Sequence, residues 1–163
     1  MLPLPPPFCL RAIVAEDQAF IDTLYRSTRD DLAAMALDET FLAKLIYMQQ
    51  HAQVQGMRNA FPHARYSLLE RGGVAVGRLV LDTHGDQVHL VELAICRSER
   101  GQGIGSTVLR ALQGLAAQRR QPLKLSVGLA NPAARSLYAR LGFRVTGADA
   151  VQERMQWLAD AAQ

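Results

Sequence analysis

The feature that most constrains the fold of this chain is a glycine-rich run between an apolar segment and an amphipathic one. The run reads Arg100-Gly-Gln-Gly-Ile-Gly105. It follows the apolar residues 88–95, and its last residues begin the segment 103–119, where apolar side chains recur at helical spacing. A strand that passes through glycines into a helix gathers backbone N–H groups and the positive helix end at one corner. We therefore expect an anion-binding corner; from spacing alone, a glycine-rich turn without a ligand is the alternative.

Two widespread phosphate-binding patterns do not fit this run. A Walker-type loop requires a lysine before the final Ser or Thr, but Gly105 is followed directly by Ser106 and Thr107. The dinucleotide pattern G-x-G-x-x-G also fails, because the third glycine comes one residue early. In addition, no acidic residue ends the next strand-like segment, 123–127, to bind a ribose. A Walker-type NTPase and a Rossmann-type dinucleotide-binding protein are therefore disfavoured.

The remaining sequence alternates between strand-like and helical patterns. Strands are predicted at residues 10–14, 66–70, 74–82, 88–95, 123–127 and 151–157. Helices are predicted from 16–17 through Leu32, from Asp38 to a stop at Pro62, over 103–119, and from Asn131 to Gly142. This order predicts one α/β domain with a mixed sheet, for which 163 residues are sufficient.

Two of these helices have well-marked ends. Asp38 is a predicted N-cap, and the apolar residues that follow it are expected on one buried face: Phe41, Leu42, Leu45 and Ile46. Asn131 is a second predicted N-cap, followed by Pro132 at the first helical position. Gly142 suits the left-handed position after that helix, and Phe143 is expected to pack back onto it.

Composition and the chain ends limit the class of protein. The net charge of +3 and the small cluster Arg119, Arg120 and Lys124 do not indicate nucleic-acid binding. No apolar run approaches the ~20 residues that span a bilayer, so we expect no membrane association and a cytoplasmic protein. Residues 1–8 are proline-rich and predict a flexible extended tail rather than a signal peptide, with the domain at 9–163. Cys9 and Cys96 make no disulfide framework, and no residue spacing suggests a metal site.

The glycine run and the segment from Asn131 together resemble the GNAT superfamily of N-acetyltransferases. Its acetyl-CoA signature is Gln or Arg, two residues, Gly, one residue, then Gly or Ala, and the run from Arg100 to Gly105 matches it. A later segment of the family is matched at Asn131, Ala134, Leu137, Tyr138, Leu141, Gly142 and Phe143. The resemblance implies a mixed, mostly antiparallel central sheet flanked by helices, and acetyl-CoA as the co-substrate.

The resemblance also implies where the coenzyme lies. Backbone N–H groups are expected to hold its pyrophosphate at Arg100, Gly101, Gln102, Gly103, Ile104, Gly105 and Ser106. The pantetheine arm is expected between two separating strands, beside Leu93, Ala94 and Ile95, with a backbone N–H near Ile95 polarising the thioester carbonyl. Asn131 and Ala134 are expected to contact the same arm; a helix cap alone is the alternative for Asn131.

The implied reaction is direct attack of an amine on the acetyl thioester. Tyr138 is the predicted general acid for the leaving thiolate, unless it is only a core aromatic. Glu92, in an apolar strand, is the predicted base, unless it is the buried partner of an arginine. His89 is a competing base that faces the other side of a regular strand unless a bulge intervenes. A water chain, or an amine that arrives neutral, is the remaining alternative.

The sequence leaves the acceptor open between a small-molecule amine and a peptide amine. The resemblance implies that the first two helices and the late strands shape its pocket, which points to residues 25–58. Four acidic residues there could attract a cation or serve only as helix-end charges: Asp30, Asp31, Asp38 and Glu39. A non-catalytic module that binds coenzyme A on the same fold is the alternative function. A homodimer is an assembly that the family permits.

Overall fold

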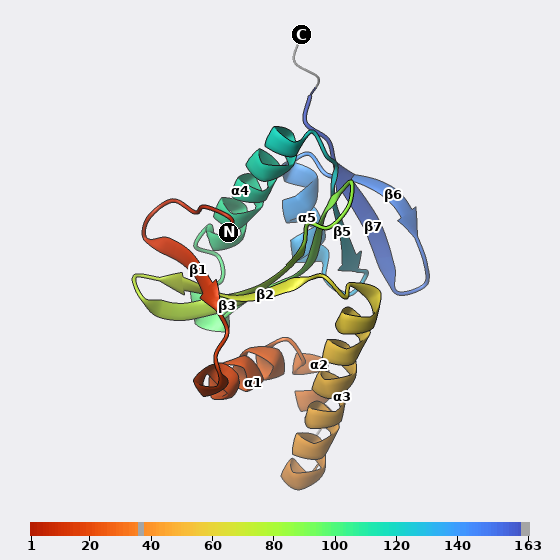
Figure 1. The fold of residues 1–163 in the computed structure, drawn as a ribbon. Coiled ribbons are helices and arrows are strands. Elements are labelled where there is room, and N and C mark those ends of the chain that lie inside the picture. The colour runs from red at the N-terminus through yellow and green to blue at the C-terminus, as the bar shows by residue number, and fades with distance from the viewer. Residues whose placement is uncertain (36–37, 161–163) are drawn as a thin grey trace.

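In the computed structural model, which describes residues 1–35 and 38–160, one sheet lies between two layers of helices (Figure 1). Its strands are β1 (Phe8–Ala12), β2 (Arg65–Arg71), β3 (Val74–Asp82), β4 (Val88–Ile95), β5 (Leu123–Gly128), β6 (Arg144–Ala148) and β7 (Gln152–Trp157). The helices are α1 (Gln18–Ser27), α2 (Asp30–Ala33), α3 (Glu39–Ala60), α4 (Ile104–Arg119) and α5 (Pro132–Arg140), with short 3-10 turns η1 (Ala15–Asp17) and η2 (Arg97–Glu99). The predicted α/β class is confirmed.

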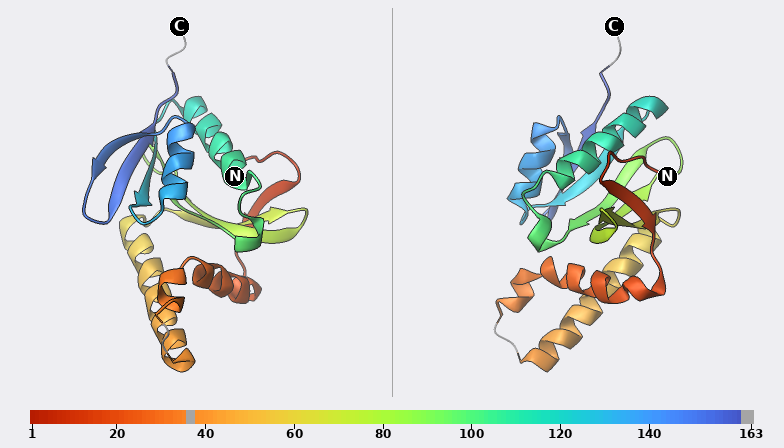
Figure 2. Two further views of the ribbon diagram at one scale, coloured as in Figure 1. Left: turned by 180° about the vertical axis from the view of Figure 1, so that it is seen from behind. Right: turned by 90° about the vertical axis from the view of Figure 1, so that its left-hand side faces the viewer.

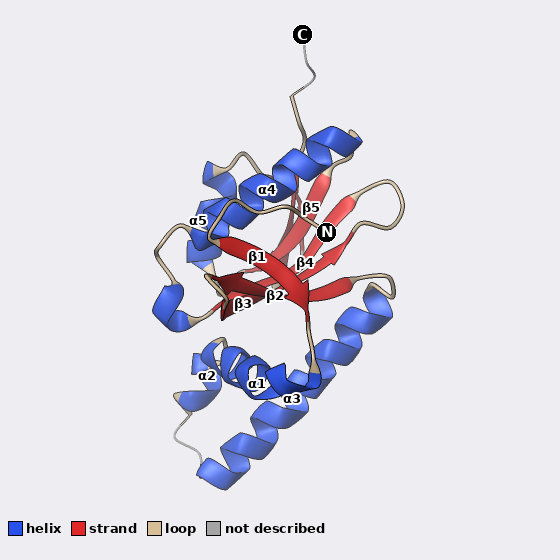
Figure 3. Ribbon diagram, turned by 60° about the vertical axis from the view of Figure 1, so that its left-hand side comes forward, coloured by secondary structure: helices blue, strands red, loops and turns tan. Residues whose placement is uncertain are grey.

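The sheet has the strand order β1-β2-β3-β4-β5-β7-β6. Among the described strands, only the central β4–β5 pair is parallel, because α4 crosses over between these two strands; the other neighbours are antiparallel. Helices α4 and α5 cover one face, and α1, α2 and α3 lie on the other (Figures 2 and 3). The sheet is therefore mixed and mostly antiparallel, as predicted.

Two separate apolar clusters stabilise the two layers. The main core lies between the sheet and α4, and includes the fully buried Val88, Leu109 and Leu112. A smaller cluster joins α1, α2 and α3 to one another through Tyr25, Leu32, Leu42 and Ile46. The helical layer α1–α3 therefore has its own core, and polar contacts contribute to its attachment to the sheet.

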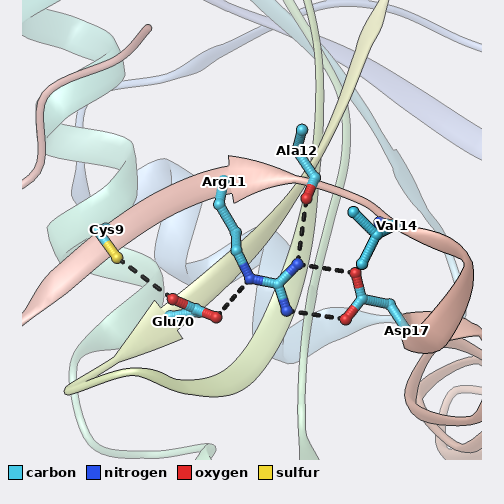
Figure 4. A network of polar contacts seen from close by, with 6 residues as sticks. All are labelled: Cys9, Arg11, Ala12, Val14, Asp17 and Glu70. Atoms are coloured by element: carbon cyan, nitrogen blue, oxygen red, sulfur yellow. Dashed lines mark hydrogen bonds and ion pairs between the residues drawn. The ribbon is translucent and has the colours of Figure 1, made fainter.

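One such attachment is a network around Arg11 on β1 (Figure 4). Its guanidinium donates two hydrogen bonds of 2.8 Å to the Asp17 carboxylate and one of 2.6 Å to Glu70 on β2. Asp17 also accepts from the backbone N–H of Val14. The Arg11 bonds, and then the Val14 bond, lower the pKa of Asp17 to about 2. Because Val14 belongs to this cap, the first strand is Phe8–Ala12, and the predicted strand 10–14 is wrong in its bounds.

Other sequence predictions also need correction. The helix predicted after Asp17 is interrupted at Arg29, whose φ of −118° and ψ of 46° are not helical. The Ser27 and Thr28 hydroxyls donate to backbone carbonyls of the turn before this break. Phe41 is 56% exposed rather than on the buried face of α3. Strand β6 was not predicted, because its residues are mostly exposed and lack an apolar alternation.

The predicted caps are confirmed. The Asp38 side chain accepts a hydrogen bond from Phe41 N, and the Asn131 side chain accepts one from Ala134 N. Gly142 has a φ of +91°, the left-handed geometry expected after α5.

The chain ahead of β1 contacts the domain. Leu2 is buried in the main core, Leu4 packs against that core, and Phe8 already belongs to β1. Flexibility of residues 1–8 stays a prediction. Among the helices that the structure describes, none has the length and apolar character required to cross a bilayer.

Candidate functional site

A cavity of about 780 Å³ opens where the two central strands separate. The β4–β5 ladder pairs Val88–Leu90 with Leu123–Leu125 and then ends, although β4 continues to Ile95. At this point Leu90 and Glu92 face successive residues of β3, so Val91 is a β-bulge. The cavity is lined from the strand by Glu92, Leu93, Ala94 and Ile95. Its volume is that of a small-molecule site.

The glycine run forms one wall of this cavity. Gly101 and Gly103 have φ values of +76° and +80°, which favour glycine, and Gly103 is the N-cap of α4. The first backbone bond of α4 runs from Thr107 N to Gly103 O, and helices leave the preceding N–H groups without intrahelical partners. Ile104, Gly105 and Ser106 line the cavity beside these groups. This corner has the geometry of an anion site.

Two residues of the predicted pyrophosphate site, Arg100 and Gln102, make contacts with other parts of the chain. The Arg100 N–H bonds to Arg97 O, so the free amides begin after it. The Arg100 side chain donates to Ile95 O at 3.0 Å and to Ser27 Oγ at 3.3 Å, although Arg100 does line the cavity. Gln102 is not among the lining residues; its side chain accepts from Arg71 on β2.

Helix α5 forms the opposite wall. Asn131, Ala134 and Tyr138, which are predicted to contact the coenzyme, line the cavity together with Leu137. A Cβ on Gly105 would lie 3.4 Å from Leu137 Cδ2, an ordinary contact distance, so α4 and α5 lie side by side at this point. The Tyr138 ring lies 5.7 Å from that of Phe143, and burial raises the pKa of its hydroxyl.

Arg140 also lines the cavity and was not singled out from the sequence. It follows Ala133 by seven residues, so the two share one face of α5. This seven-residue spacing was the sequence signal from which Arg140 could have been identified. Arg140 gives this wall a cation that could face an anionic ligand.

Glu92 forms an ion pair with Arg78 of β3. Arg78 Nε and Nη2 lie 2.7 Å and 2.6 Å from Glu92 Oε2, and Gln53 of α3 donates to Oε1 at 3.3 Å. Arg78 is 5% exposed. Glu92 therefore lines the cavity and is also the partner of a buried arginine, the alternative that the sequence left open. Gln53 and Arg78 were missed because only the strand register and the position of α3 bring them to Glu92.

The bulge places His89 on the same side of β4 as Glu92, facing α3. The His89 ring lies 4.4 Å from that of Phe61, just after the end of α3, while Gln53 of the same helix contacts Glu92. Burial lowers the pKa of His89, a nearby Asp82 raises it and Lys124 lowers it. His89 is not among the residues that line the cavity.

The acidic residues of the predicted acceptor region already have partners. Asp30 pairs with Arg97, Asp31 with Arg29 and Glu39 with Arg26. Asp38 caps α3. Of the four, only Asp30 lines the cavity. Within residues 1–35 and 38–160, no three His, Cys, Asp or Glu side chains are grouped so that they could hold a metal ion.

Comparison with known proteins gives a family match and a fold match. The acetyltransferase (GNAT) family model matches residues 22–143. No curated protein matches the sequence.

Among solved structures, a PaiA N-acetyltransferase from Thermoplasma acidophilum in complex with coenzyme A has a TM-score of 0.68 and 16% identity over 93% of this chain and 99% of its own. The RimL ribosomal L7/L12 alpha-N-protein acetyltransferase has a TM-score of 0.64 and 16% identity, over 99% of both chains. A chimera of the spermidine N-acetyltransferase SpeG from Vibrio cholerae and hSSAT has a TM-score of 0.62 and 19% identity, over 93% of this chain and 95% of its own. At these identities the structural matches establish a shared fold.

Proposed function

Since the chain belongs to the GNAT family of acetyltransferases, we propose that it transfers the acetyl group of acetyl-CoA to an amino group of an acceptor. The observation that carries this proposal is the cavity between the separating strands, which joins a glycine corner, β4 and α5 in one space. The three walls offer backbone donors, an open strand edge and a tyrosine, which are the groups that an acyl thioester requires.

The described residues fit coenzyme A. Free N–H groups at the start of α4 suit the pyrophosphate, with Gly101 and Gly103 allowing its close approach and Arg140 adding charge. The β4 edge from Leu93 to Ile95 suits the pantetheine arm, whose amides can pair with a strand. Asn131 and Ala134 border the same space. The related PaiA structure contains coenzyme A, which supports this assignment.

Acetyl-CoA supplies an activated acetyl group; the chain supplies orientation and proton transfer. We assign Tyr138 as the general acid that protonates the leaving sulfur, because its side chain lines the cavity and burial, which raises its pKa, keeps the hydroxyl protonated at neutral pH. A backbone N–H near Ile95 polarises the acetyl carbonyl. Glu92 Oε1, which receives only the Gln53 hydrogen bond, faces the acceptor amine and takes its proton as the bond to carbon forms.

The rival function is a module on the same fold that binds coenzyme A without catalysis. It predicts binding of acetyl-CoA without release of free thiol in the presence of amines. Tyr138 in the cavity wall favours the enzyme, because a binding module needs no acid there.

Calorimetry on two glycine variants tests the coenzyme site. Gly103→Glu introduces a charge and a side chain at the corner, and is expected to weaken acetyl-CoA binding about 100-fold or more, about 2.7 kcal/mol. Gly73→Glu is the matched control, because Gly73 has a φ of +83°, has open space around it and lies in the β2–β3 turn. Equal affinity in both variants would refute the site. Thiol release with an amine library, checked by a gain of one acetyl group in mass spectra, tests turnover.

A further inference from the structure

Every carboxylate that lines the cavity faces an arginine. Asp30 pairs with Arg97, Glu92 with Arg78, and Glu99 with Arg71 at 3.4 Å. The other charged lining residues are Arg100 and Arg140. Over the described ranges, the wall thus offers no unpaired carboxylate to an entering cation. An acceptor with several positive charges therefore gains little electrostatic binding free energy there.

The same wall has no group free to deprotonate an ammonium before attack. Among the residues that the structure describes, no histidine lines the cavity, and burial raises the pKa of Tyr138. Glu92 Oε2 is held by two N–H groups of Arg78, and Oε1 receives one hydrogen bond from Gln53. This paired carboxylate therefore takes a proton from nitrogen only once the N–C bond forms and makes that nitrogen acidic. The acceptor nitrogen needs its lone pair to attack, so the acceptor must arrive as the neutral amine.

This requirement separates two classes of amine by their own basicity. An α-amino group with a pKa near 7.8 is neutral in roughly a third of molecules at about pH 7.5, whereas an alkylamine with a pKa near 10.4 is neutral in about one in a thousand. The ratio of neutral fractions is therefore roughly 250.

We infer that the acceptor of this enzyme is a peptide with a free α-amino group and no further positive charge nearby, rather than a lysine side chain or a polyamine. The inference rests on the proposed function. The neutral nitrogen attacks the acetyl carbon, the N–C bond forms and the C–S bond breaks. Tyr138 gives a proton to the sulfur, and the surplus proton on nitrogen leaves through Glu92 Oε1 to water, from which Tyr138 is reprotonated.

Matched acceptors test the inference at saturating acetyl-CoA. The first is Ser-Ala-Gly-Ala-Gly amide with a free α-amino group, and the second is acetyl-Ser-Ala-Lys-Ala-Gly amide, whose one amine is on lysine. Spermidine is the third. We expect kcat/KM for the first to exceed that for the other two by about tenfold or more near pH 7.5, with the gap narrowing as the pH rises.

A charge variant tests the electrostatic part separately. Arg97→Gln releases the exposed Asp30 at the cavity wall, and is expected to raise kcat/KM for spermidine relative to the free peptide several-fold. Arg26→Gln releases the exposed Glu39, which does not line the cavity, and should leave that ratio unchanged. An equal shift in both variants, or none in Arg97→Gln, would overturn the argument from paired carboxylates.

The outcomes also separate this inference from the proposed function. Acetylation of spermidine or the lysine peptide at least as fast as the free peptide overturns the inference while the acetyltransferase assignment stands. Acetylation of other library amines but of neither peptide would likewise overturn the inference and leave the acetyltransferase assignment standing. If acetyl-CoA does not bind, or no amine in the library releases thiol, the proposed function itself fails.

Discussion

Arg78 and Glu92 form an ion pair across neighbouring strands, with 2.6 Å between Nη2 and Oε2, at the edge of the cavity. Their side chains are 6% and 16% exposed. The two residues lie on β3 and β4, one strand step apart, just where the Val91 bulge turns β4 away from β5. The pair thus ties a carboxylate of the cavity wall to β3, and Gln53 of α3 contacts the same carboxylate.

Breaking this pair should be costly because it leaves one charge buried. We expect Arg78→Met to lower the free energy of unfolding by about 3 kcal/mol, measured by urea denaturation. The double variant Arg78→Met with Glu92→Leu should recover most of that loss, because two apolar side chains need no partner. A double variant as unstable as Arg78→Met would show that lost packing, rather than the unpaired Glu92 carboxylate, lowers the free energy of unfolding.

Tyr138→Phe should lower kcat about 100-fold without changing the affinity for acetyl-CoA. The substitution keeps the ring that contacts Phe143 and removes only the hydroxyl. Since burial raises the pKa of Tyr138 above its ordinary value of 10, its deprotonation should cause no loss of wild-type activity between about pH 7 and 9. Steady-state rates and calorimetry test both statements, and equal turnover in the two proteins would remove the general-acid role.

The Arg11–Asp17 pair should make stability depend on acidity. The pKa of Asp17 is about 2 in the folded protein and near 3.8 when unfolded, so folding favours the carboxylate. Its contribution is present above pH 3.8 and is lost as the pH falls toward 2. Asp17→Asn should therefore be less stable than the wild type at neutral pH, with the difference shrinking below pH 3.8. A constant difference across that range would contradict the assignment.

The elements around the cavity could be predicted from sequence because their signals are local. Glycines at a strand-to-helix corner, and Asn131 with Pro132 at a helix start, fix the backbone through a few neighbouring residues. Strands β3 and β4 match their predicted bounds for the same reason, since turn residues flank each one. Most of the candidate site lies on these elements.

The remaining features depend on partners far along the chain. The Val91 bulge appears only when β4 is paired with β3, and Arg78 meets Glu92 only through that register. Strand β6 is recognisable through its pairing with β7, where the Arg154 guanidinium lies over Gly147 so closely that a Cβ there would displace that side chain. Phe41 follows the helical pattern of its neighbours, but that pattern alone does not show where no other element packs against the helix and the side chain is left exposed.

His89 provides the last test, because the bulge brings it to the Glu92 side of β4 and yet outside the cavity wall. His89→Gln should therefore keep kcat within about twofold of the wild type, whereas Glu92→Gln should lower it, both measured with the peptide that has a free α-amino group. Burial lowers the pKa of His89 below its ordinary 6.5, so folding favours the neutral ring and wild-type stability should fall as the pH drops below 6.5. The Gln variant should lose that part of the pH dependence in urea denaturation. If His89→Gln instead reduces kcat more than about tenfold at unchanged acetyl-CoA affinity, His89 rather than Glu92 receives the proton of the acceptor amine.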